Sequence, residues 1–539
     1  MRTRYKSLLV TGLLITAGVA LALLLAGCGS GAQSGSSTGP VSTTFTYDTY
    51  SPVMVGWDPS TENSNSITAL ANVYETLTVY NAVTNKVDPL LATSWSTSPD
   101  GLTWTFQIRP NVYFHTGRLM TAQAVKASIE RTIKLNQGAA YIWSAVKSIA
   151  TPNSSTIVFH LTHSVPFDVV AAAGYAAYIF DTKASGSESL AKWFEAAHEA
   201  GTGPYVVQTW NSGQETELVL KSFPKYWRGW SGTHYKRVVF RVVPQDTTAV
   251  QLLTSGQVSF VEQISPVLWA SLKTNPQVQL INVPLWQNLL GMMNCKSGPL
   301  ADLTVRRAVS YAIDYKGIVA ALKGVAALSG GGLVPPGLWG HSDDLPNNYI
   351  YDTSKAAQLL NSVGYGPGKK PLKLLATTTQ GDSNEQLVAA IMKSDLAQVN
   401  VNLSVQPLAW PTQWAKAQSS DLSKRQDILL FYWWPDYADP YSWFLRLLHT
   451  ETNVYLNFSY FSDPQLDEMM GRAEALAATN RAEATALYRQ MQIIVLQQAP
   501  MLLLYNMNGL FAALKSVGNL QINPAYANVV FVYDLNPLP

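Results

Sequence analysis

The chain is poor in cysteine and in charged residues. Only two cysteines, Cys28 and Cys295, occur in 539 residues, which is too few for a disulfide framework. Charged residues make up 13% of the chain, and 37 Lys and Arg against 35 Asp and Glu leave a formal net charge of +2. Because nucleic-acid binding needs a strongly basic face, this balance argues against a nucleic-acid partner.

Motifs that mark common enzyme classes are also missing. The sequence contains no G-x-S-x-G, Walker A, G-x-G-x-x-G or H-E-x-x-H. S-x-x-K, a motif of penicillin-recognising enzymes, occurs at 222–225. Those enzymes place its serine at a helix start, whereas Pro224 indicates a turn here. His160 and His163 are three apart in a strand pattern, so they point to opposite faces. We therefore predict no enzyme activity, no cofactor and no metal site.

Apolar and aromatic residues, in contrast, are abundant. Hydrophobic residues make up 47% of the chain, which includes 16 Trp and 26 Tyr. This composition is typical of an ordered globular protein with surfaces for flat or apolar ligands. At roughly 100–200 residues per domain, the length allows roughly two to four domains or one large two-lobed protein.

The N-terminus has the pattern of a secretory signal. Arg2, Arg4 and Lys6 precede an apolar run at 8–26. The run is long enough for a transmembrane anchor, which is the alternative interpretation, but no basic stop-transfer segment follows it. We expect a signal peptide at 1–27.

The end of the apolar run resembles a bacterial lipobox, Leu-Ala-Gly-Cys at 25–28. The resemblance implies cleavage before Cys28 and lipidation of that residue, which anchors the protein to the outer side of a bacterial membrane through more than one acyl chain. Residues 28–40 are rich in Gly, Ser and Thr, as expected of a flexible tether. The folded body is predicted to begin near Val41.

Strand and helix signals alternate along the body. Apolar and polar residues alternate at 102–109, 157–161, 238–242 and 401–405, which predicts half-buried strands. Helix starts are predicted at the following capping residues: Asp302, Ser383 paired with Gln386, Asp463 before Pro464, and Asn480. Alternation of this kind indicates an α/β fold.

Several motifs resemble, in the same order, blocks of the family 5 extracellular solute-binding proteins, the peptide and nickel receptors of ABC importers. The blocks are YETL at 74–77, DPLLATSW at 88–95, DGLTWTF at 100–106, FHTG at 114–117, TAQAV at 121–125, GTGPY at 201–205, VRRA at 305–308, YAID at 311–314 and WPDYADP at 434–440. Each block is short, but so many collinear blocks are specific.

The resemblance implies a two-lobed α/β fold of the type II periplasmic-binding-protein class with an extra inserted subdomain. We expect a discontinuous lobe I, an inserted segment and a lobe II. Their predicted ranges are 41–73, 201–285 and 506–539 for lobe I, 74–200 for the inserted segment and 286–505 for lobe II.

Most of the matching residues also have a structural interpretation. Gly101, Gly117, Gly201 and Gly203 are expected to permit turns. Arg306 and Arg307 are expected to serve a helix surface or packing between lobes, and Trp95 and Trp104 to fill core.

For the segment at 431–440 we favour a ligand-binding role over a purely structural one. In peptide-binding relatives the Trp-x-x-Asp-Tyr pattern carries the aspartate that pairs with a peptide α-ammonium, and Trp433, Asp436 and Tyr437 match it. Such a carboxylate can form a charge-assisted hydrogen bond with an ammonium group, and a face of Trp433 or Trp434 can add cation–π attraction. The alternative is that Asp436 caps a loop.

Two further segments match ligand contacts of the family. Ser64, Asn65 and Ser66 match an edge on which extended peptides add as a strand. Tyr141 matches an aromatic residue that lines the ligand pocket.

The resemblance implies a monomeric extracytoplasmic receptor that captures peptides between its lobes and delivers them to ABC permease subunits. An oligosaccharide ligand is the first alternative, because sugars stack on Trp. Nickel or a metal chelate is the second.

Overall fold

The computed structural model describes residues 42–62, 64–345, 349–526 and 528–539. The predicted signal peptide, the tether and Cys28 lie outside the described residues. Over the four described stretches, no helix is both long enough and apolar enough to cross a membrane.

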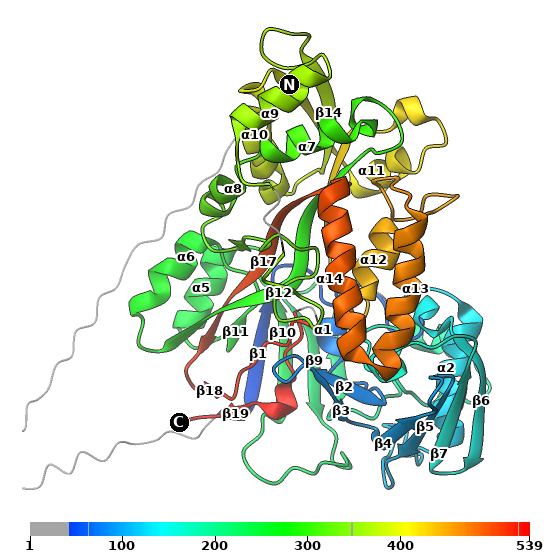
Figure 1. The fold of residues 1–539 in the computed structure, drawn as a ribbon. Coiled ribbons are helices and arrows are strands. Elements are labelled where there is room, and N and C mark those ends of the chain that lie inside the picture. Colours follow the sequence, from blue (N-terminus) through cyan, green and yellow to red (C-terminus); the bar gives the residue numbers. More distant parts are fainter. Residues whose placement is uncertain (1–41, 63, 346–348, 527) are drawn as a thin grey trace, which may run out of the picture. The chain divides into compact units, whose positions relative to one another are not determined.

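One mixed sheet forms the centre of the described chain, with the strand order β15-β14-β16-β12-β17-β11-β1-β10-β9-β8 and β13 beside β17 (Figure 1). The bounds are β1 Thr44–Thr49, β8 Tyr205–Trp210, β9 Thr216–Ser222, β10 Arg237–Val242, β11 Phe260–Val261, β12 Val278–Met293, β13 Ala326–Ala327, β14 Leu372–Thr379, β15 Val401–Leu408, β16 Ile428–Trp433 and β17 Met501–Leu514. β1 pairs in parallel with β10 and β11, and β14 with β15 and β16. The predicted strands at 238–242 and 401–405 are confirmed.

Two long antiparallel strands, β12 and β17, connect the two ends of this sheet (Figure 1). Their pairing runs from Val278 opposite Leu514 to Met292 opposite Met501, with an irregular stretch between Pro284 and Asn288. The predicted limits of lobes I and II, 285/286 and 505/506, fall inside these strands. The lobe boundaries themselves stay a prediction.

The inserted segment contains a separate antiparallel sheet with the order β4-β5-β7-β6 and a hairpin of β2 and β3. The bounds are β2 Thr78–Asn81, β3 Lys86–Pro89, β4 Ala92–Thr97, β5 Thr103–Ile108, β6 Val146–Asn153 and β7 Thr156–Leu161. The strands predicted at 102–109 and 157–161 are thus confirmed. Phe106 and Phe159, one on each of β5 and β7, pack edge to face in its core.

Close backbone contact joins the two ends of the inserted segment. The amide of Gly203 donates to the carbonyl of Val73 at 2.9 Å, and that of Tyr205 to Asn72 at 3.2 Å. A Cβ atom on Gly201 or Gly203 would lie 2.1 or 2.6 Å from the Val73 oxygen, so these glycines permit close approach. They do not have positive φ, whereas the predicted turn glycines Gly101 and Gly117 do.

The helices pack on both sheets and on one another. Their bounds are α1 Ile67–Leu70, α2 Ala122–Leu135, α3 Phe167–Val170, α4 Leu190–Glu195, α5 Asp246–Thr254, α6 Pro266–Ser271, α7 Leu303–Tyr311, α8 Tyr315–Ala321, α9 Thr353–Ser362, α10 Ser383–Ala397, α11 Trp410–Ala417, α12 Tyr441–Leu448, α13 Pro464–Thr479 and α14 Arg481–Gln498. Short strands β18 Val517–Gly518 and β19 Asn536–Pro537 pair near the C-terminus.

Side-chain caps set three of the predicted helix starts. Asp302, Asp463 and Asn480 accept backbone N–H groups at the starts of α7, α13 and α14. The cap predicted at Ser383 is wrong by one residue. Asp382 caps α10 through the amide of Glu385, because its carboxylate precedes the helix and Ser383 is already helical.

Arg306 is buried inside the predicted lobe II, rather than on a helix surface or between the lobes as predicted. Its guanidinium donates to the carbonyls of Gln498 and Ala499, where α14 ends. A cation that satisfies the free carbonyls of a helix C-terminus stabilises that end. Arg306 therefore fixes α7 against α14.

Candidate functional site

The segment predicted to bind ligand leaves the central sheet at the end of β16 and enters α12. Trp433 is the last residue of β16, and Pro435 follows where the strand has ended. The two adjacent indoles meet different surroundings: Trp433 is 8% exposed and Trp434 is 46% exposed.

Trp433 belongs to the core rather than to the site. Its ring packs against Phe431 within the large core cluster beneath α12, α13 and α14. Its indole N–H is buried and has no hydrogen-bond partner in the part of the chain that the structure describes. Trp434, in contrast, lines a small cavity together with Asp436.

Asp436 lies between two cavities. The larger, about 220 Å³, is bounded by Tyr141, Tyr437, Arg446 and Glu474. The smaller, about 20 Å³, separates Trp434 and Asp436 from Gly174, Tyr175 and Gln287. Residues of the predicted inserted segment, lobe I and lobe II thus meet around one carboxylate.

Three side chains contact the Asp436 carboxylate. The hydroxyls of Tyr141 and Ser442 form hydrogen bonds with it, and Nε of Arg446 lies 3.8 Å from Oδ2. Burial raises the pKa of Asp436 above its usual value, and the Tyr141 hydroxyl and the Arg446 charge oppose that rise. The Asp436 side chain is 21% exposed, so the carboxylate can still be reached.

The structure brings Tyr141 to Asp436, and the role of Tyr141 in lining a ligand pocket stays a prediction. Tyr141 lies in a 3₁₀ turn, Ala140–Trp143, that follows α2. The guanidinium of Arg446 lies 3.8 Å from the centroid of the Tyr141 ring. Tyr437 lines the same cavity, half-buried against the cores on both sides.

Sequence reasoning missed Arg446 and Glu474. Ser442 and Arg446 lie one turn apart on α12, and this spacing is the signal that could have placed Arg446 beside Asp436. Glu474 comes from α13, and burial raises its pKa to about 8, so it is protonated at neutral pH. No sequence signal connects it with the site.

Residues 64–66 do not form a strand, and their role as ligand contacts stays a prediction. Ser64 and Ser66 lie in a turn before α1, not on an extended strand edge. The Ser66 hydroxyl accepts the amides of Val55 at 2.8 Å and Gly56 at 3.3 Å, which holds the turn. Neither Ser64, Asn65 nor Ser66 lines the cavities beside Asp436.

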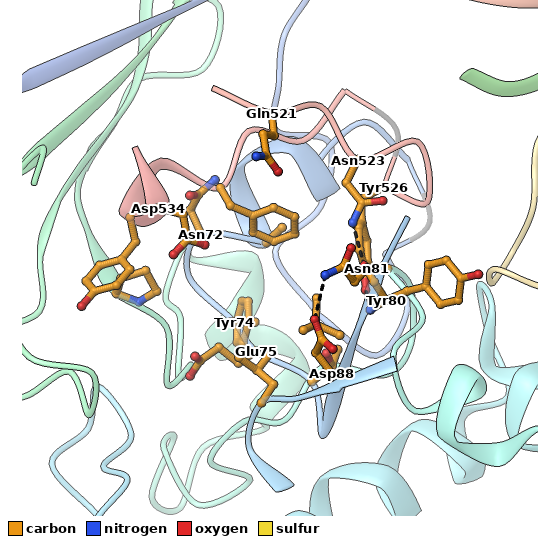
Figure 2. Close-up of a pocket in the computed structure, with 18 of the residues that line it drawn as sticks. Asn72, Tyr74, Glu75, Tyr80, Asn81, Asp88, Gln521, Asn523, Tyr526 and Asp534 are labelled. Atoms are coloured by element: carbon orange, nitrogen blue, oxygen red, sulfur yellow. Dashed lines mark hydrogen bonds between the residues drawn. The ribbon is translucent and has the colours of Figure 1, made fainter. Parts of the chain in front are cut away.

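A separate cavity of about 290 Å³ lies between the β2–β3 hairpin and the C-terminal segment (Figure 2). Its polar walls are largely paired with one another. The Asn81 amide donates to Asp88 at 2.9 Å, and the Asn523 amide donates to the Tyr80 carbonyl at 2.7 Å.

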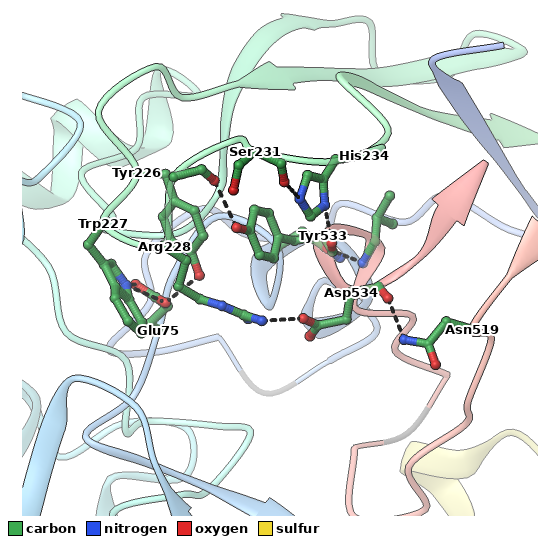
Figure 3. A network of polar contacts seen from close by, with 12 residues as sticks. Glu75, Tyr226, Trp227, Arg228, Ser231, His234, Asn519, Tyr533 and Asp534 are labelled. Atoms are coloured by element: carbon green, nitrogen blue, oxygen red, sulfur yellow. Dashed lines mark hydrogen bonds and ion pairs between the residues drawn. The ribbon is translucent and has the colours of Figure 1, made fainter. Parts of the chain in front are cut away.

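Glu75 lies at the edge of that cavity in a polar network (Figure 3). Its carboxylate accepts hydrogen bonds from Thr202 at 2.8 Å, Tyr226 at 3.0 Å and the Trp227 indole at 3.0 and 3.1 Å. Near it, Arg228 pairs with Asp534 at 2.7 Å. The network ties the start of the inserted segment to lobe I.

Comparison with known proteins places the chain in a family. The model of "Bacterial extracellular solute-binding proteins, family 5 Middle" matches residues 86–454. A probable D,D-dipeptide-binding periplasmic protein of Escherichia coli, DdpA, is 27% identical over 88% of this chain and 90% of its own length. Heme-binding protein A of Haemophilus influenzae is also 27% identical, over 89% and 91%.

Solved structures share the fold. HbpA2 from Haemophilus parasuis has a TM-score of 0.79 at 22% identity and covers 92% of this chain and 100% of its own. DppA from Helicobacter pylori, solved with the peptide STSA, has a TM-score of 0.75 at 22% identity, over 93% and 99%.

The chain belongs to family 5 of the bacterial extracellular solute-binding proteins. The two-lobed α/β fold predicted from the sequence is confirmed. The family consists of transport receptors rather than enzymes. These receptors bind peptides or other small solutes outside the cytoplasm and work with ABC permeases. The solute of this receptor is a separate question.

Proposed function

We propose that the chain captures peptides around Asp436 and delivers them to ABC permease subunits. The observation that carries the proposal is a carboxylate, mostly buried yet reachable, where segments of both lobes and the inserted segment meet. Three of the relatives are named for peptides, binding a D,D-dipeptide, glutathione and a dipeptide.

The chemistry of a peptide N-terminus suits this position. An α-ammonium loses water when it enters a closed site, and an unpaired buried charge costs several kcal/mol. Asp436 supplies a fixed negative charge, and a charge-assisted hydrogen bond offsets the lost hydration. A cavity of about 220 Å³ is small, which favours a short ligand or one end of a longer one.

The oligosaccharide alternative rests on tryptophan. Trp433 is part of the core, so Trp434 alone of this pair offers an accessible ring for stacking. The metal-chelate alternative is supported by two solved structures of the same fold, which hold a nickel–histidine complex and an Fe(III)–EDTA complex. The heme-binding relative adds a further small solute.

Calorimetry on the full mature chain separates these ligands. We expect heat from short peptides with a free amino group, and much weaker binding of the same peptides after N-acetylation. Tight binding of an oligosaccharide or a nickel chelate with no peptide heat would overturn the peptide assignment. Mass spectrometry of whatever copurifies from the native host gives an independent identification.

Anchoring through Cys28 is part of the same proposal, with the receptor a monomer on the outer side of the membrane. The mature protein should partition with membranes and carry acyl mass on Cys28, whereas Cys28→Ala should be unacylated. A mature N-terminus upstream of Cys28 without lipid would contradict this.

A further inference from the structure

Arg446 occupies the Asp436 cavity with most of its hydrogen-bonding capacity unused. Its side chain is 18% exposed, and its Nε lies 3.8 Å from Asp436 Oδ2, which is too long for a hydrogen bond. A guanidinium carries five N–H donors. Among the described residues, the Tyr141 hydroxyl is the hydrogen-bond partner of this guanidinium. Several donors therefore remain for a ligand.

The position of Tyr141 holds this guanidinium in place. The Tyr141 ring lies under the guanidinium at 3.8 Å, and its hydroxyl bonds to both Arg446 and Asp436. Stacking on an aromatic ring leaves the edge of a guanidinium free to meet a carboxylate with two parallel hydrogen bonds. Arg446 is thus oriented as well as charged.

The charges of the cavity wall balance before any ligand enters. Asp436 contributes one negative charge and Arg446 one positive charge, while Glu474 is protonated at neutral pH. A ligand that brings only an ammonium would leave excess positive charge beside Arg446, in a cavity where charges interact more strongly than in water. Every free peptide also carries a C-terminal carboxylate, so the distinguishing feature is a carboxylate close enough to the α-ammonium on Asp436 to reach Arg446.

We propose that the site selects ligands whose first residue carries a carboxylate close to its α-ammonium, with the ammonium on Asp436 and the carboxylate on Arg446. This specificity rests on the proposed function as a peptide receptor. Two kinds of peptide have this chemistry: those that begin with α-linked Glu or Asp, and those that begin with γ-linked Glu. Arg446 is the residue that determines the selection.

The test compares first residues by calorimetry on the full mature chain. The ligands are Glu-Ala, γ-Glu-Ala, Gln-Ala and Ala-Ala, each also with one more Ala. At least one acidic ligand should bind roughly 10- to 150-fold tighter than Gln-Ala, as a charge-assisted hydrogen bond implies. The linkage that binds tighter identifies which of the two kinds of peptide the site takes.

Arg446→Gln should remove this preference, so that Glu-Ala, γ-Glu-Ala and Gln-Ala bind to this variant with similar affinity. Arg446→Lys keeps the charge but cannot form two parallel bonds, so it should retain only part of the preference. Arg472→Gln, a change at an exposed arginine of α13, is the matched control and should bind as wild type. Should Arg446→Gln not fold, the Lys variant and the wild-type ligand series still decide.

The role of Arg446 and the proposed function as a peptide receptor can fail separately. Equal binding of acidic and neutral first residues by wild type, or an acidic preference that survives Arg446→Gln, would overturn the role of Arg446 and leave peptide capture standing. Absence of heat with every peptide would instead reject the proposed function, and the specificity with it.

Discussion

Glu75 is a buried carboxylate of this receptor and Asp436 is a partly buried one, and the two differ in what surrounds them. Glu75 is 5% exposed and accepts a hydrogen bond from Thr202. It also accepts hydrogen bonds from Tyr226 and Trp227 (Figure 3). Asp436 has two hydroxyl partners, a distant guanidinium and a cavity on either side. A carboxylate accepts about four hydrogen bonds, so Glu75 is close to saturation.

The difference separates a structural acid from one that can serve a ligand. The donors around Glu75 belong to the protein, and removing the carboxylate would leave them without a hydrogen-bond acceptor. The surroundings of Asp436 leave room for a donor from outside. A raised pKa alone therefore does not identify a ligand site, because both groups have raised pKa values. What distinguishes them is the remaining hydrogen-bonding capacity.

The largest expected effect is on stability, from Glu75→Ala. Three buried donors lose their acceptor, and each unsatisfied group costs about 1–3 kcal/mol, so the free energy of unfolding should fall by about 3 kcal/mol or more. Urea denaturation followed by circular dichroism measures the loss. Glu188→Gln, at an exposed position of the inserted segment, should leave stability unchanged. A change of less than about 1 kcal/mol in the free energy of unfolding of Glu75→Ala would show that Glu75 is not a structural carboxylate.

Asp436→Asn should weaken peptide binding and leave stability nearly unchanged, the reverse of Glu75→Ala. The shape of the side chain stays and its charge is lost, so peptide affinity should fall roughly 10- to 150-fold, which corresponds to about 1.5–3 kcal/mol. Stability should change little, because the cavities accommodate the amide. Calorimetry and urea denaturation on the same preparation give both numbers. Glu468→Gln, exposed on α13, is the matched control. Unchanged affinity would mean that Asp436 only caps its loop.

The pH dependence of stability should reveal the titration of the Glu75 carboxyl group. Burial raises its pKa to about 7 from 4.5, against the hydrogen bonds that lower it. The folded state then holds an extra proton between these values, so this contribution to stability is complete below pH 4.5 and is lost as pH rises to about 7. Glu75→Gln cannot titrate. The stability of wild type relative to this variant should therefore fall across the interval, by about 1–3 kcal/mol. A constant difference between the two proteins would show that Glu75 does not titrate there.

The smallest expected effect comes from Tyr141→Phe. This change removes the hydroxyl between Arg446 and Asp436 but keeps the ring beneath the guanidinium. Loss of one hydrogen bond of about 0.5–1.5 kcal/mol should weaken peptide binding roughly 2- to 12-fold. Binding measured by calorimetry should respond while stability stays near that of wild type. A loss as large as that of Asp436→Asn would show that the hydroxyl contacts the ligand directly.

Local patterns predicted much of the fold. The alternation at 102–109 and the caps at Asp302, Asp463 and Asn480 depend on neighbours a few residues away, and the structure confirms them. The segment at 64–66 is a turn rather than a strand edge, because the Ser66 hydroxyl accepts amides 10 and 11 residues earlier in the same β1–α1 connection, a contact that local spacing does not reveal.

The site was predictable only in part for the same reason. Asp436 and Tyr141 came from a family resemblance, and the structure brings them together. Arg446 depends on how α12 is turned toward the inserted segment, which is decided by tertiary packing. The partners of Glu75 lie 127 to 152 residues further along the chain, so no local pattern could connect them.

The paired strands β12 and β17 have a mechanical consequence. Asn288 donates to Asn506 across the pair at 2.6 Å, and the Trp443 indole donates to Asn288 at 2.6 Å, just beyond the irregular stretch. A single strand would let the two ends of the central sheet twist freely, whereas two hydrogen-bonded strands resist torsion and leave bending as the easy motion. Under the proposed function, bending of this strand pair near Asn288 would accompany release of a solute bound beside Asp436.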